Sequence, residues 1–413
     1  MNQELLNNTK SIEAIASEFP ILKVEVNNNN LVYLDNGSTT HKPLSVLKAI
    51  DNLYTRSYSN IHRGVHTLSQ KSTLLYEEAR RAVAKYINAD REEEIIFTSG
   101  TTESINLIAH SYGRKFVQRG DVILVSAMEH HSNILPWQML CEEKGAVLKV
   151  IPISKSGEIL FEEYKKLLSE KVKLVAITAI SNTLGTVNDI KSIISNAHQV
   201  GAVVAVDAAQ AIAHQKVDVQ DWKADFVSFS GHKMYAPTGI GVLFGKLDLL
   251  NQMPPYKGGG GIIKTVSFEK VEYADVPLKF EAGTPNIEGA IGLKAAIDFI
   301  SQFDFNEIEK HEAEIVNWTV EHLKAIPEVE LVGEPNHRCG IISFNVKGCH
   351  PMDVGVLLDK QGVAVRTGHH CTQPLMQFYR IQGTIRVSFG IYNTLKDAER
   401  FIFALQKSIK MLL

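Results

Sequence analysis

Short runs of β-branched and other apolar residues recur between residues 94 and 244 and alternate with segments of helical periodicity. Several runs are apolar on both faces, which is the pattern of buried strands in a mostly parallel sheet. Residues 73–87 instead repeat apolar positions at helical spacing. The seven runs are residues 94–98, 122–125, 147–151, 174–178, 203–206, 226–229 and 240–244. The pattern predicts one large α/β domain with a seven-stranded, mostly parallel sheet.

The last two runs break this rhythm, because only the ten residues 230–239 separate them. That is too short for a helical crossover, so we expect these two strands to be antiparallel neighbours. After about Gly292 come two long helical patterns, strands near 340–346, 363–366 and 385–388, and the amphipathic segment Leu395–Leu412. We therefore predict a large domain over residues 31–292 and a smaller C-terminal α/β domain over 293–413. An N-terminal segment, 1–30, is expected to pack with the smaller domain.

The composition excludes several classes of protein. The 413 residues are 45% hydrophobic, which is typical of a folded protein. The net charge of −3 provides no basic field for nucleic acid or for an anionic membrane. Four cysteines without a C-x-x-C pair are too few for a disulfide framework. No signal-peptide pattern and no apolar run of ~18 residues is present. We expect a soluble, reduced, cytoplasmic protein.

Lys233 and Asp207 are the first chemical candidates. Lys233 follows the run 226–229, in SFSGHKMYAPTG. Most lysines are exposed, but an amine kept neutral in a pocket at a strand end can attack a carbonyl carbon. Asp207 ends the run VVAVD and could merely cap the following helix. A carboxylate there would also keep the ring nitrogen of pyridoxal 5'-phosphate (PLP) protonated, as this electron-accepting cofactor requires. Gln210 could donate to the phenolic oxygen of the same ring.

A candidate phosphate site lies at residues 97–103, FTSGTTE, which join a strand to a helix. The free N–H groups and hydroxyls at such a positive helix end, here those of Thr101 and Thr102, can bind an anion. The same pattern is also that of an ordinary helix cap. Ser230 and His232, on either side of the turn into Lys233, could supply further donors.

Two histidine-containing segments raise the question of a metal. His130 and His131 are adjacent, and neighbouring side chains of an extended segment point apart, so a zinc site is disfavoured. We expect His130 to stack on a flat cofactor and to move a proton. Residues 366–374, RTGHHCTQP, place Cys371 in a polar loop that favours an accessible thiolate. No second cluster at ligand spacing supports a metal, so none is expected. Arg386, on a predicted strand, could grip a substrate carboxylate through two hydrogen bonds.

These segments resemble those of the PLP-dependent cysteine desulfurases. The resemblance is to the SUF-type (group II) enzymes of iron–sulfur cluster assembly, class V aminotransferases that are close to selenocysteine lyases. It extends from about Leu31 to the C-terminus, in the family's order. It rests on GTTESIN, EHHSN, SNTLGT, VDAAQ, SGHKMYAPTGIG, EAGTPN and RTGHHC. It implies the PLP-dependent transferase fold of type I and a homodimer with active sites at the subunit interface.

The resemblance also implies roles for the cofactor-binding candidates. Lys233 would bind PLP as a Schiff base, Asp207 would pair with the ring nitrogen, and His130 would stack on the ring. Gln210 would contact the phenolic oxygen. The phosphate would be held by Thr101, Thr102, Ser230, His232 and, from the neighbouring subunit, Thr284 of EAGTPN.

The implied reaction converts L-cysteine to L-alanine and leaves a persulfide on Cys371, which an acceptor protein of the SUF system would receive. Asn182, Arg366 and Arg386 would bind the substrate carboxylate, and His62 of NIHRG would lie near the active site. Selenocysteine lyase is the alternative function. Transamination is disfavoured because it needs no nucleophilic cysteine.

The chain departs from the family's pattern at two places. Thr372 and Gln373 follow the cysteine, where the family commonly has alanine and a hydrophobic residue. Ile262 stands where an acidic residue is expected. Both places are ones where contacts to another subunit or to a sulfur acceptor form, so they bear on the partner rather than on the chemistry.

Overall fold

A seven-stranded sheet forms the centre of the protein. The structure is a computed structural model that describes residues 15–413, so the predicted segment 1–30 lies partly outside the described residues. The strands, in spatial order, are β4 (Ile95–Thr98), β10 (Gly241–Gly245), β9 (Phe226–Ser230), β8 (Val203–Asp207), β7 (Val172–Thr178), β5 (Val122–Ser126) and β6 (Val147–Ile151). All seven predicted strands are present, and β10 is the antiparallel member, paired with β9 and β4. The predicted fold class is confirmed.

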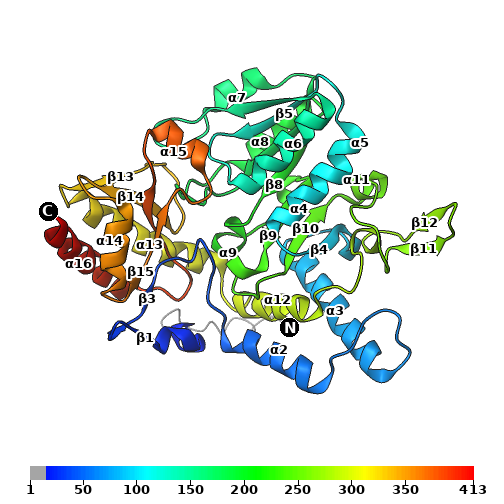
Figure 1. Cartoon of the computed structure of the whole chain (residues 1–413), viewed down its shortest axis with the longest axis horizontal. Helices are drawn as coiled ribbons and strands as arrows, with labels where there is room; N and C mark the ends of the chain where they lie inside the picture. The colour runs from blue at the N-terminus through cyan, green and yellow to red at the C-terminus, as the bar shows by residue number, and fades with distance from the viewer. Residues whose placement is uncertain (1–14) are drawn as a thin grey trace, which may run out of the picture.

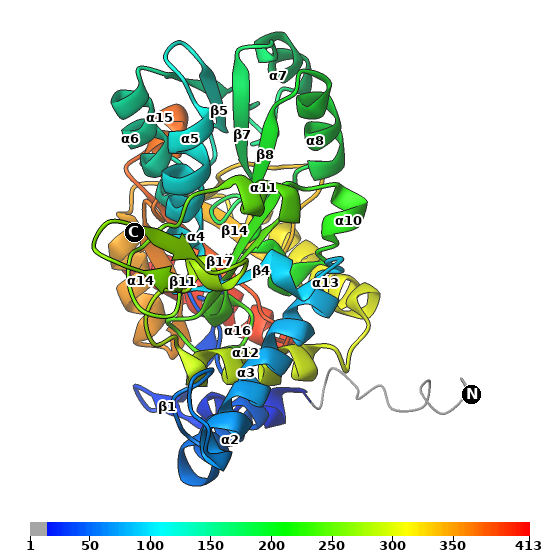
Figure 2. The ribbon, with the colours of Figure 1, turned by 90° about the vertical axis from the view of Figure 1, so that its right-hand side faces the viewer.

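Helices cover both faces of this sheet, as Figures 1 and 2 show. Because successive side chains of a strand alternate, Val204 and Val206 of β8 face one core while Ala205 faces the other. In Figure 2, α5 and α6 lie on one side of β7 and β8, and α8 and α10 lie on the other. The helices of this part are α2 (Leu44–Arg56), α3 (Thr67–Tyr86), α4 (Thr101–Leu107), α5 (Arg114–Phe116), α6 (Leu135–Lys144), α7 (Phe161–Leu167), α8 (Ile190–Gln199), α9 (Ala211–His214), α10 (Val219–Trp222), α11 (Leu247–Gln252) and α12 (Ile287–Ile300).

A second, smaller sheet is built from the C-terminal part of the chain. Its antiparallel order is β13 (Val329–Leu331), β14 (Ile341–Val346), β17 (Thr384–Ser388) and β16 (Arg366–Gly368). The helices of this part are α13 (Phe305–Lys324), α14 (Pro351–Asp359), α15 (Gln373–Tyr379) and α16 (Leu395–Leu412). Its core is a separate apolar cluster that includes Phe344 and Phe401. The domain boundaries stay predictions, and α12 is continuous across the one at 292/293.

The N-terminal residues join the two parts. Strand β3 (Val32–Tyr33) pairs in parallel with β15 (Val363–Ala364) of the C-terminal part. The hairpin of β1 (Glu25–Val26) and β2 (Asn29–Asn30) turns at Asn27 and Asn28, which are left-handed with φ of 53° and 59°. Asparagine tolerates this conformation better than most residues. Phe19 is fully buried against Tyr235 and Phe299 as well as Tyr392, so this segment contacts both parts.

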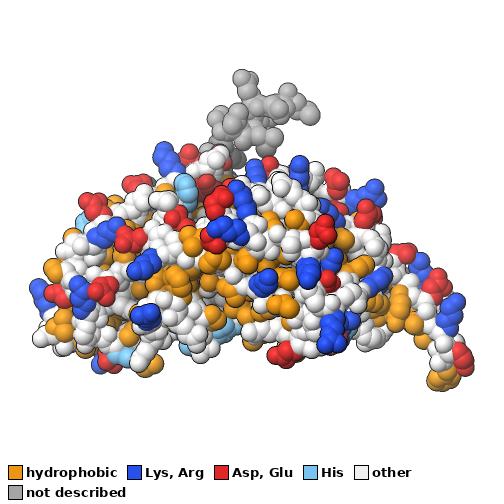
Figure 3. Space-filling view, turned by 90° about the horizontal axis from the view of Figure 1, so that it is seen from above, with side chains coloured by type: hydrophobic (Ala, Val, Ile, Leu, Met, Phe, Trp, Pro, Cys, Tyr) orange, Lys and Arg blue, Asp and Glu red, His pale blue; other side chains and the backbone are white. Residues whose placement is uncertain are grey.

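The surface carries no simple charge pattern. On the face shown in Figure 3, basic and acidic side chains are intermixed with hydrophobic ones, in keeping with the small net charge. The hairpin of β11 (Ile263–Val266) and β12 (Val271–Tyr273) projects at the right of Figure 1 and exposes Phe268. Within residues 15–413, every helix is too short or too polar to cross a bilayer. The cytoplasmic location stays a prediction.

A buried ion pair fastens the end of the sheet to the segment before α12. The guanidinium of Arg80 donates to both carboxylate oxygens of Glu281, at 2.7 and 2.9 Å, and to the carbonyl of Ile95 at 2.7 Å. The Phe97 amide and the Tyr76 hydroxyl also donate to Glu281, at 2.7 and 3.0 Å. Both charged side chains are at most 4% exposed. Removal of the Arg80 charge would leave Glu281 without compensation in the interior, and removal of the Glu281 charge would leave Arg80 with only the more exposed Glu77, whose carboxylate lies 2.9 Å from Nε.

We therefore expect Glu281→Gln to lower the free energy of unfolding by about 3 kcal/mol. Urea unfolding of the wild type and the variant measures the difference. Asp298→Asn is the matched control, because Asp298 pairs with Lys294 on the surface and such pairs contribute at most about 1 kcal/mol. Equal losses of unfolding free energy in the two variants would contradict the claim that the buried pair contributes more than the exposed one.

Candidate active site

A cavity lies where the carboxyl ends of the central strands face the smaller sheet. This is the edge at which open α/β sheets commonly bind ligands. The segments that follow β5, β7, β8 and β9 contribute to its wall, together with the start of α4 and the loop between β16 and α15. Twelve residues that the sequence singled out line it: Thr101, Thr102, His130, Asn182, Asp207, Gln210, Ser230, His232, Lys233, Arg366, Cys371 and Arg386.

Two predicted residues do not line the cavity of this chain. His62 is left-handed, with φ of 68°, and its Nε2 lies 2.9 Å from Oε1 of Glu77. Thr284 is exposed in the turn before α12. Neither prediction is supported within a single chain, and the one for Thr284 concerns a neighbouring subunit.

Lys233 and Asp207 form the charged floor of the cavity. Lys233 ends a single 3-10 turn, residues Gly231–Lys233, that directly follows β9. Burial lowers the pKa of Lys233 to about 8; Asp207 opposes this shift, and the cations Arg386 and Arg366 add to it. Burial raises the pKa of Asp207, against the effect of Lys233 and of the Ala209 amide, which donates to Oδ1 at 2.9 Å. The amine is therefore much closer to its neutral form than an exposed lysine is.

The predicted phosphate end is rich in hydrogen-bond donors. The Thr101 amide donates to Ser230 Oγ at 2.8 Å, and the two hydroxyls are also 2.8 Å apart. The approach is close: a Cβ at Gly241 would lie 2.4 Å from the Cα of Gly100, which has φ of +156°. Burial lowers the pKa of His232 to about 4, and its buried Nδ1 has no partner among the described residues. Thr101, Ser230 and His232 all line the cavity.

His130 is held by its own turn. The Ser132 amide donates to His130 Nδ1 at 3.1 Å, and the Ser132 hydroxyl lies 2.7 Å from the same nitrogen. Burial and then the charge of Lys233 lower the pKa of His130 to about 3, so its ring is neutral and carries its proton on Nε2. The preceding residue anchors the turn: buried Glu129 accepts from the Ser126 hydroxyl at 2.5 Å, from the Asn133 amide at 2.7 Å and from the Thr178 backbone at 3.0 Å.

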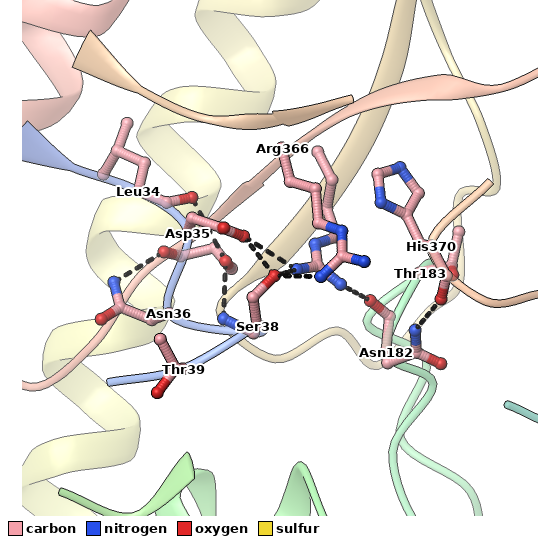
Figure 4. A network of polar contacts seen from close by, with 12 residues as sticks. Leu34, Asp35, Asn36, Ser38, Thr39, Asn182, Thr183, Arg366 and His370 are labelled. Carbon is pink, nitrogen blue, oxygen red and sulfur yellow. Dashed lines mark hydrogen bonds and ion pairs between the residues drawn. The ribbon is translucent and has the colours of Figure 1, made fainter. Parts of the chain in front are cut away.

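Arg386 belongs to a network of polar contacts in the cavity, and Figure 4 shows Asp35, Ser38, Asn182 and Arg366 of this network. Its Nη1 donates to the Asn182 carbonyl at 2.8 Å, and its Nη2 donates to Asp35 at 3.0 Å and to Ser38 Oγ at 2.8 Å. Ser38 Oγ also accepts from Arg366 at 2.6 Å. The buried Nε of Arg386 has no partner among the described residues. The protein thus uses three of the five N–H groups of the guanidinium, and the Nε hydrogen and one Nη1 hydrogen remain.

Two predicted amides are also partly engaged. Asn182 Nδ2 donates to the His370 carbonyl at 2.9 Å, and Gln210 Nε2 donates to the Gly37 carbonyl at 2.8 Å. Sequence reasoning missed Asp35, Ser38 and Glu129. A signal for Ser38 existed in the Asp-Asn-Gly-Ser sequence that begins one residue after β3, but no local pattern relates that segment to Arg386.

Cys371 occupies a tight loop at the cavity. His370 and Cys371 are both left-handed, with φ of 51° and 58°. The Cys371 amide donates to His369 Nδ1 at 3.2 Å, and its carbonyl accepts from the His131 amide at 2.8 Å. The other cysteines lie elsewhere: Cys141 and Cys339 are buried, and Cys349 is partly buried.

One group of possible metal ligands occurs among the described residues, outside this cavity. Donor atoms of His214, Glu312 and Cys339 lie within 4.8 Å of one another. His214 Nδ1 and Glu312 Oε2 are 2.7 Å apart, and the Gly340 amide donates to the other Glu312 oxygen. The polar groups of this cluster therefore satisfy one another, as in an ordinary buried ion pair.

Comparisons with known proteins give the family of the chain. The sequence pattern of the family "Aminotransferase class-V" matches residues 32–401. The chain is 50% identical to the "Probable cysteine desulfurase" of Staphylococcus aureus (strain Mu50) over 398 residues, which are 96% of each protein. It is 46% identical to the "Cysteine desulfurase" of Pectobacterium carotovorum over 402 residues, which are 97% of this chain and 98% of the relative.

A solved structure is similar along the same length. The apo structure of the cysteine desulfurase from Thermococcus onnurineus NA1 is 40% identical in sequence and superposes with a TM-score of 0.92, over 97% of this chain and 98% of that one. The resemblance stated from the motifs is confirmed at the level of the family, while the SUF-type subgroup stays a prediction. On this evidence of sequence and fold together, the chain belongs to the aminotransferase class-V family.

Proposed function

We propose that the protein is a PLP-dependent cysteine desulfurase, which converts L-cysteine to L-alanine and leaves a persulfide on Cys371. The observation that carries the proposal is the meeting of three groups in one cavity: the amine of Lys233, the carboxylate of Asp207 and the thiol of Cys371. The relatives named cysteine desulfurases give the substrate. A transaminase would need the first two groups but not the third.

The residues present fit PLP. The cofactor has an aldehyde, a basic ring nitrogen, a flat face and a phosphate, and the cavity offers a matching group for each. Lys233 would bind the aldehyde carbon, and Asp207, whose burial raises its pKa, would be compensated by a proton on the ring nitrogen. The buried Nδ1 of His232 has no partner among the described residues, so it would be available to donate a hydrogen bond to the phosphate. Such a bond would offset the cost of removing the phosphate from water.

The other predicted residues would complete the binding of the cofactor. Thr101, Thr102 and Ser230 would add donors at the phosphate, and His130 would lie against the ring face. Gln210 has a second amide hydrogen for the phenolic oxygen, because its donation to Gly37 uses only one. When bound, PLP supplies an electron sink that stabilises negative charge on the carbon next to the substrate's amine.

The substrate carboxylate would be held by the cationic side of the cavity. Arg386 Nε has no partner, and Arg366 and Asn182 line the same wall. Two guanidinium groups close together need an anion, and Asp35 compensates only part of their charge. A carboxylate bound here would direct the sulfur of cysteine toward the loop of Cys371.

The chain's own groups would then move protons and sulfur. Lys233, with its pKa near 8, can take the α-proton near neutral pH and return a proton to carbon. The Cys371 thiolate would attack the substrate sulfur: the C–S bond breaks, the carbon keeps the electron pair and gains a proton, and an S–S bond forms. Neutral His130 can pass protons at this thiol. The products are alanine and the Cys371 persulfide.

The proposal extends to partners and location. The cysteine lies on a loop that is only partly buried, which suits delivery of sulfur to an acceptor protein, here proposed to be one of the SUF system. In the proposed homodimer, exposed Thr284 would reach the phosphate of the second copy, and His62 would approach that site. All four cysteines are free thiols, which supports a reducing, cytoplasmic location.

Lys233→Ala should abolish the absorption band that lysine-bound PLP gives near the visible edge. The amine that binds the aldehyde is absent from this variant. Lys279→Ala is the matched control: burial also lowers the pKa of Lys279, but this lysine donates to the Asn251 carbonyl and does not line the cavity, so the variant should keep the band. Spectra of the purified proteins after incubation with PLP decide the matter, and an unchanged band in Lys233→Ala would contradict the assignment.

Cys371→Ser should reduce the formation of alanine from L-cysteine by at least about a hundredfold, because a serine hydroxyl is a poor nucleophile toward sulfur at neutral pH. The variant should retain the cofactor's absorption. Cys349→Ser, which changes a partly buried cysteine outside the cavity, should keep its activity. If Cys371→Ser instead kept full activity on cysteine, the covalent step would be wrong; full activity on selenocysteine alone would favour the alternative lyase.

A further inference from the structure

The conformation of the Cys371 loop depends on contacts with residues outside the loop. Two successive residues, His370 and Cys371, adopt the left-handed conformation, which side-chain-bearing residues adopt only when surrounding contacts enforce it. The enforcing contacts come from the large sheet's side of the cavity. Asn182 donates to the His370 carbonyl at 2.9 Å, and His131 donates to the Cys371 carbonyl at 2.8 Å. The position of the thiol therefore depends on hydrogen bonds that cross between the two parts of the protein.

Thr372 adds a side-chain contact to this set. Its hydroxyl donates to the His369 carbonyl at 2.9 Å, within the loop, and lies 2.9 Å from the hydroxyl of Thr183. Because the one hydroxyl hydrogen of Thr372 is used on His369, Thr183 is the donor across the gap. Both threonines are fully buried. Thr183 directly follows Asn182, which lines the cavity.

We propose that Thr372 is a positioning residue whose hydroxyl fastens the Cys371 loop to Thr183 and so keeps the thiol directed into the cavity. The inference rests on the proposed function only for the role of the thiol. It also gives a reason for a threonine directly after the cysteine, where the family resemblance led us to expect alanine. An alanine would leave the fully buried Thr183 hydroxyl without this partner, whereas the His369 carbonyl would still accept from the amide of residue 372, at 2.8 Å.

The side chain of His131 contacts the same loop one residue further along, at Gln373. The Gln373 amide donates to His131 Nε2 at 3.1 Å, which requires a neutral ring with its proton on Nδ1. Burial and then His369 lower the pKa of His131, so the ring is neutral near pH 7 and can accept this hydrogen bond. The loop is thus held before Cys371 by Asn182 at His370, and after it by Thr183 at Thr372 and His131 at Gln373.

The test compares Thr372→Val, Thr372→Ser and Thr183→Val in the PLP-loaded enzyme. Valine keeps the shape but removes the hydroxyl, and we expect Cys371 to react with iodoacetamide about fivefold faster and kcat for cysteine to fall by a similar factor, the worth of one hydrogen bond. KM for cysteine should change little, because the residues proposed to bind the carboxylate are untouched. Thr372→Ser should restore both rates. Thr183→Val should reproduce the effect, and the double valine variant should add little to either single one.

Two controls distinguish the loss of the Thr372–Thr183 hydrogen bond from other effects of the substitutions. Thr319→Val replaces another fully buried threonine, whose hydroxyl donates within its own helix at 2.7 Å, and should leave both rates unchanged. The pH midpoint of the alkylation should stay the same in Thr372→Val while the plateau rises, since the thiol becomes more accessible rather than more acidic.

The proposal is overturned if Thr372→Val is alkylated at the wild-type rate or more slowly, or if Thr372→Ser behaves like Thr372→Val. The alkylation needs no substrate. A protein that produced no alanine from cysteine would refute the proposed function, yet the alkylation rates would still decide the role of Thr372.

Discussion

The cavity depends on the burial of one positive charge. Arg386 is 1% exposed, and an arginine so far from water must be surrounded by acceptors, because an uncompensated buried charge costs several kcal/mol. The acceptors come from the segment after β3 and from the segment after β7, while Arg386 itself belongs to β17. The charge is compensated only when these three segments meet. Their meeting closes the cavity, and it brings the C-terminal loop of Cys371 next to the lysine at the end of β9.

Burial also sets the protonation of the chemical groups. The same desolvation that lowers the pKa of Lys233 to about 8 lowers those of His130 and His232 to about 3 and 4. One environment therefore yields an amine that can act as a base near neutral pH and two imidazoles that stay neutral. For Asp207 the pKa shift has the opposite sign, because burial disfavours the charged carboxylate and so raises its pKa. A protonated ring nitrogen beside it would relieve that cost, so the protein and the proposed cofactor are electrostatically complementary.

Local pattern was sufficient for the fold and for part of the site. The apolar runs gave the seven strands to within about two residues at each end, and the short gap before β10 gave its antiparallel direction. Lys233, Asp207 and His130 could be found because each lies at the carboxyl end of a buried strand or shortly after it. Asp35 and Ser38 could not, since they contact Arg386 across about 350 positions of sequence. Pairing of this kind depends on tertiary packing, and neither periodicity nor motif spacing encodes it.

Mass spectrometry of the PLP-loaded protein after brief incubation with L-cysteine tests the central claim most directly, because it observes the transferred atom itself. The account predicts that the peptide containing Cys371 gains the mass of one sulfur atom, that a reductant removes this sulfur, and that the peptides of Cys141, Cys339 and Cys349 stay unchanged. An unmodified Cys371 under conditions in which alanine accumulates, or sulfur found on another cysteine, would contradict it.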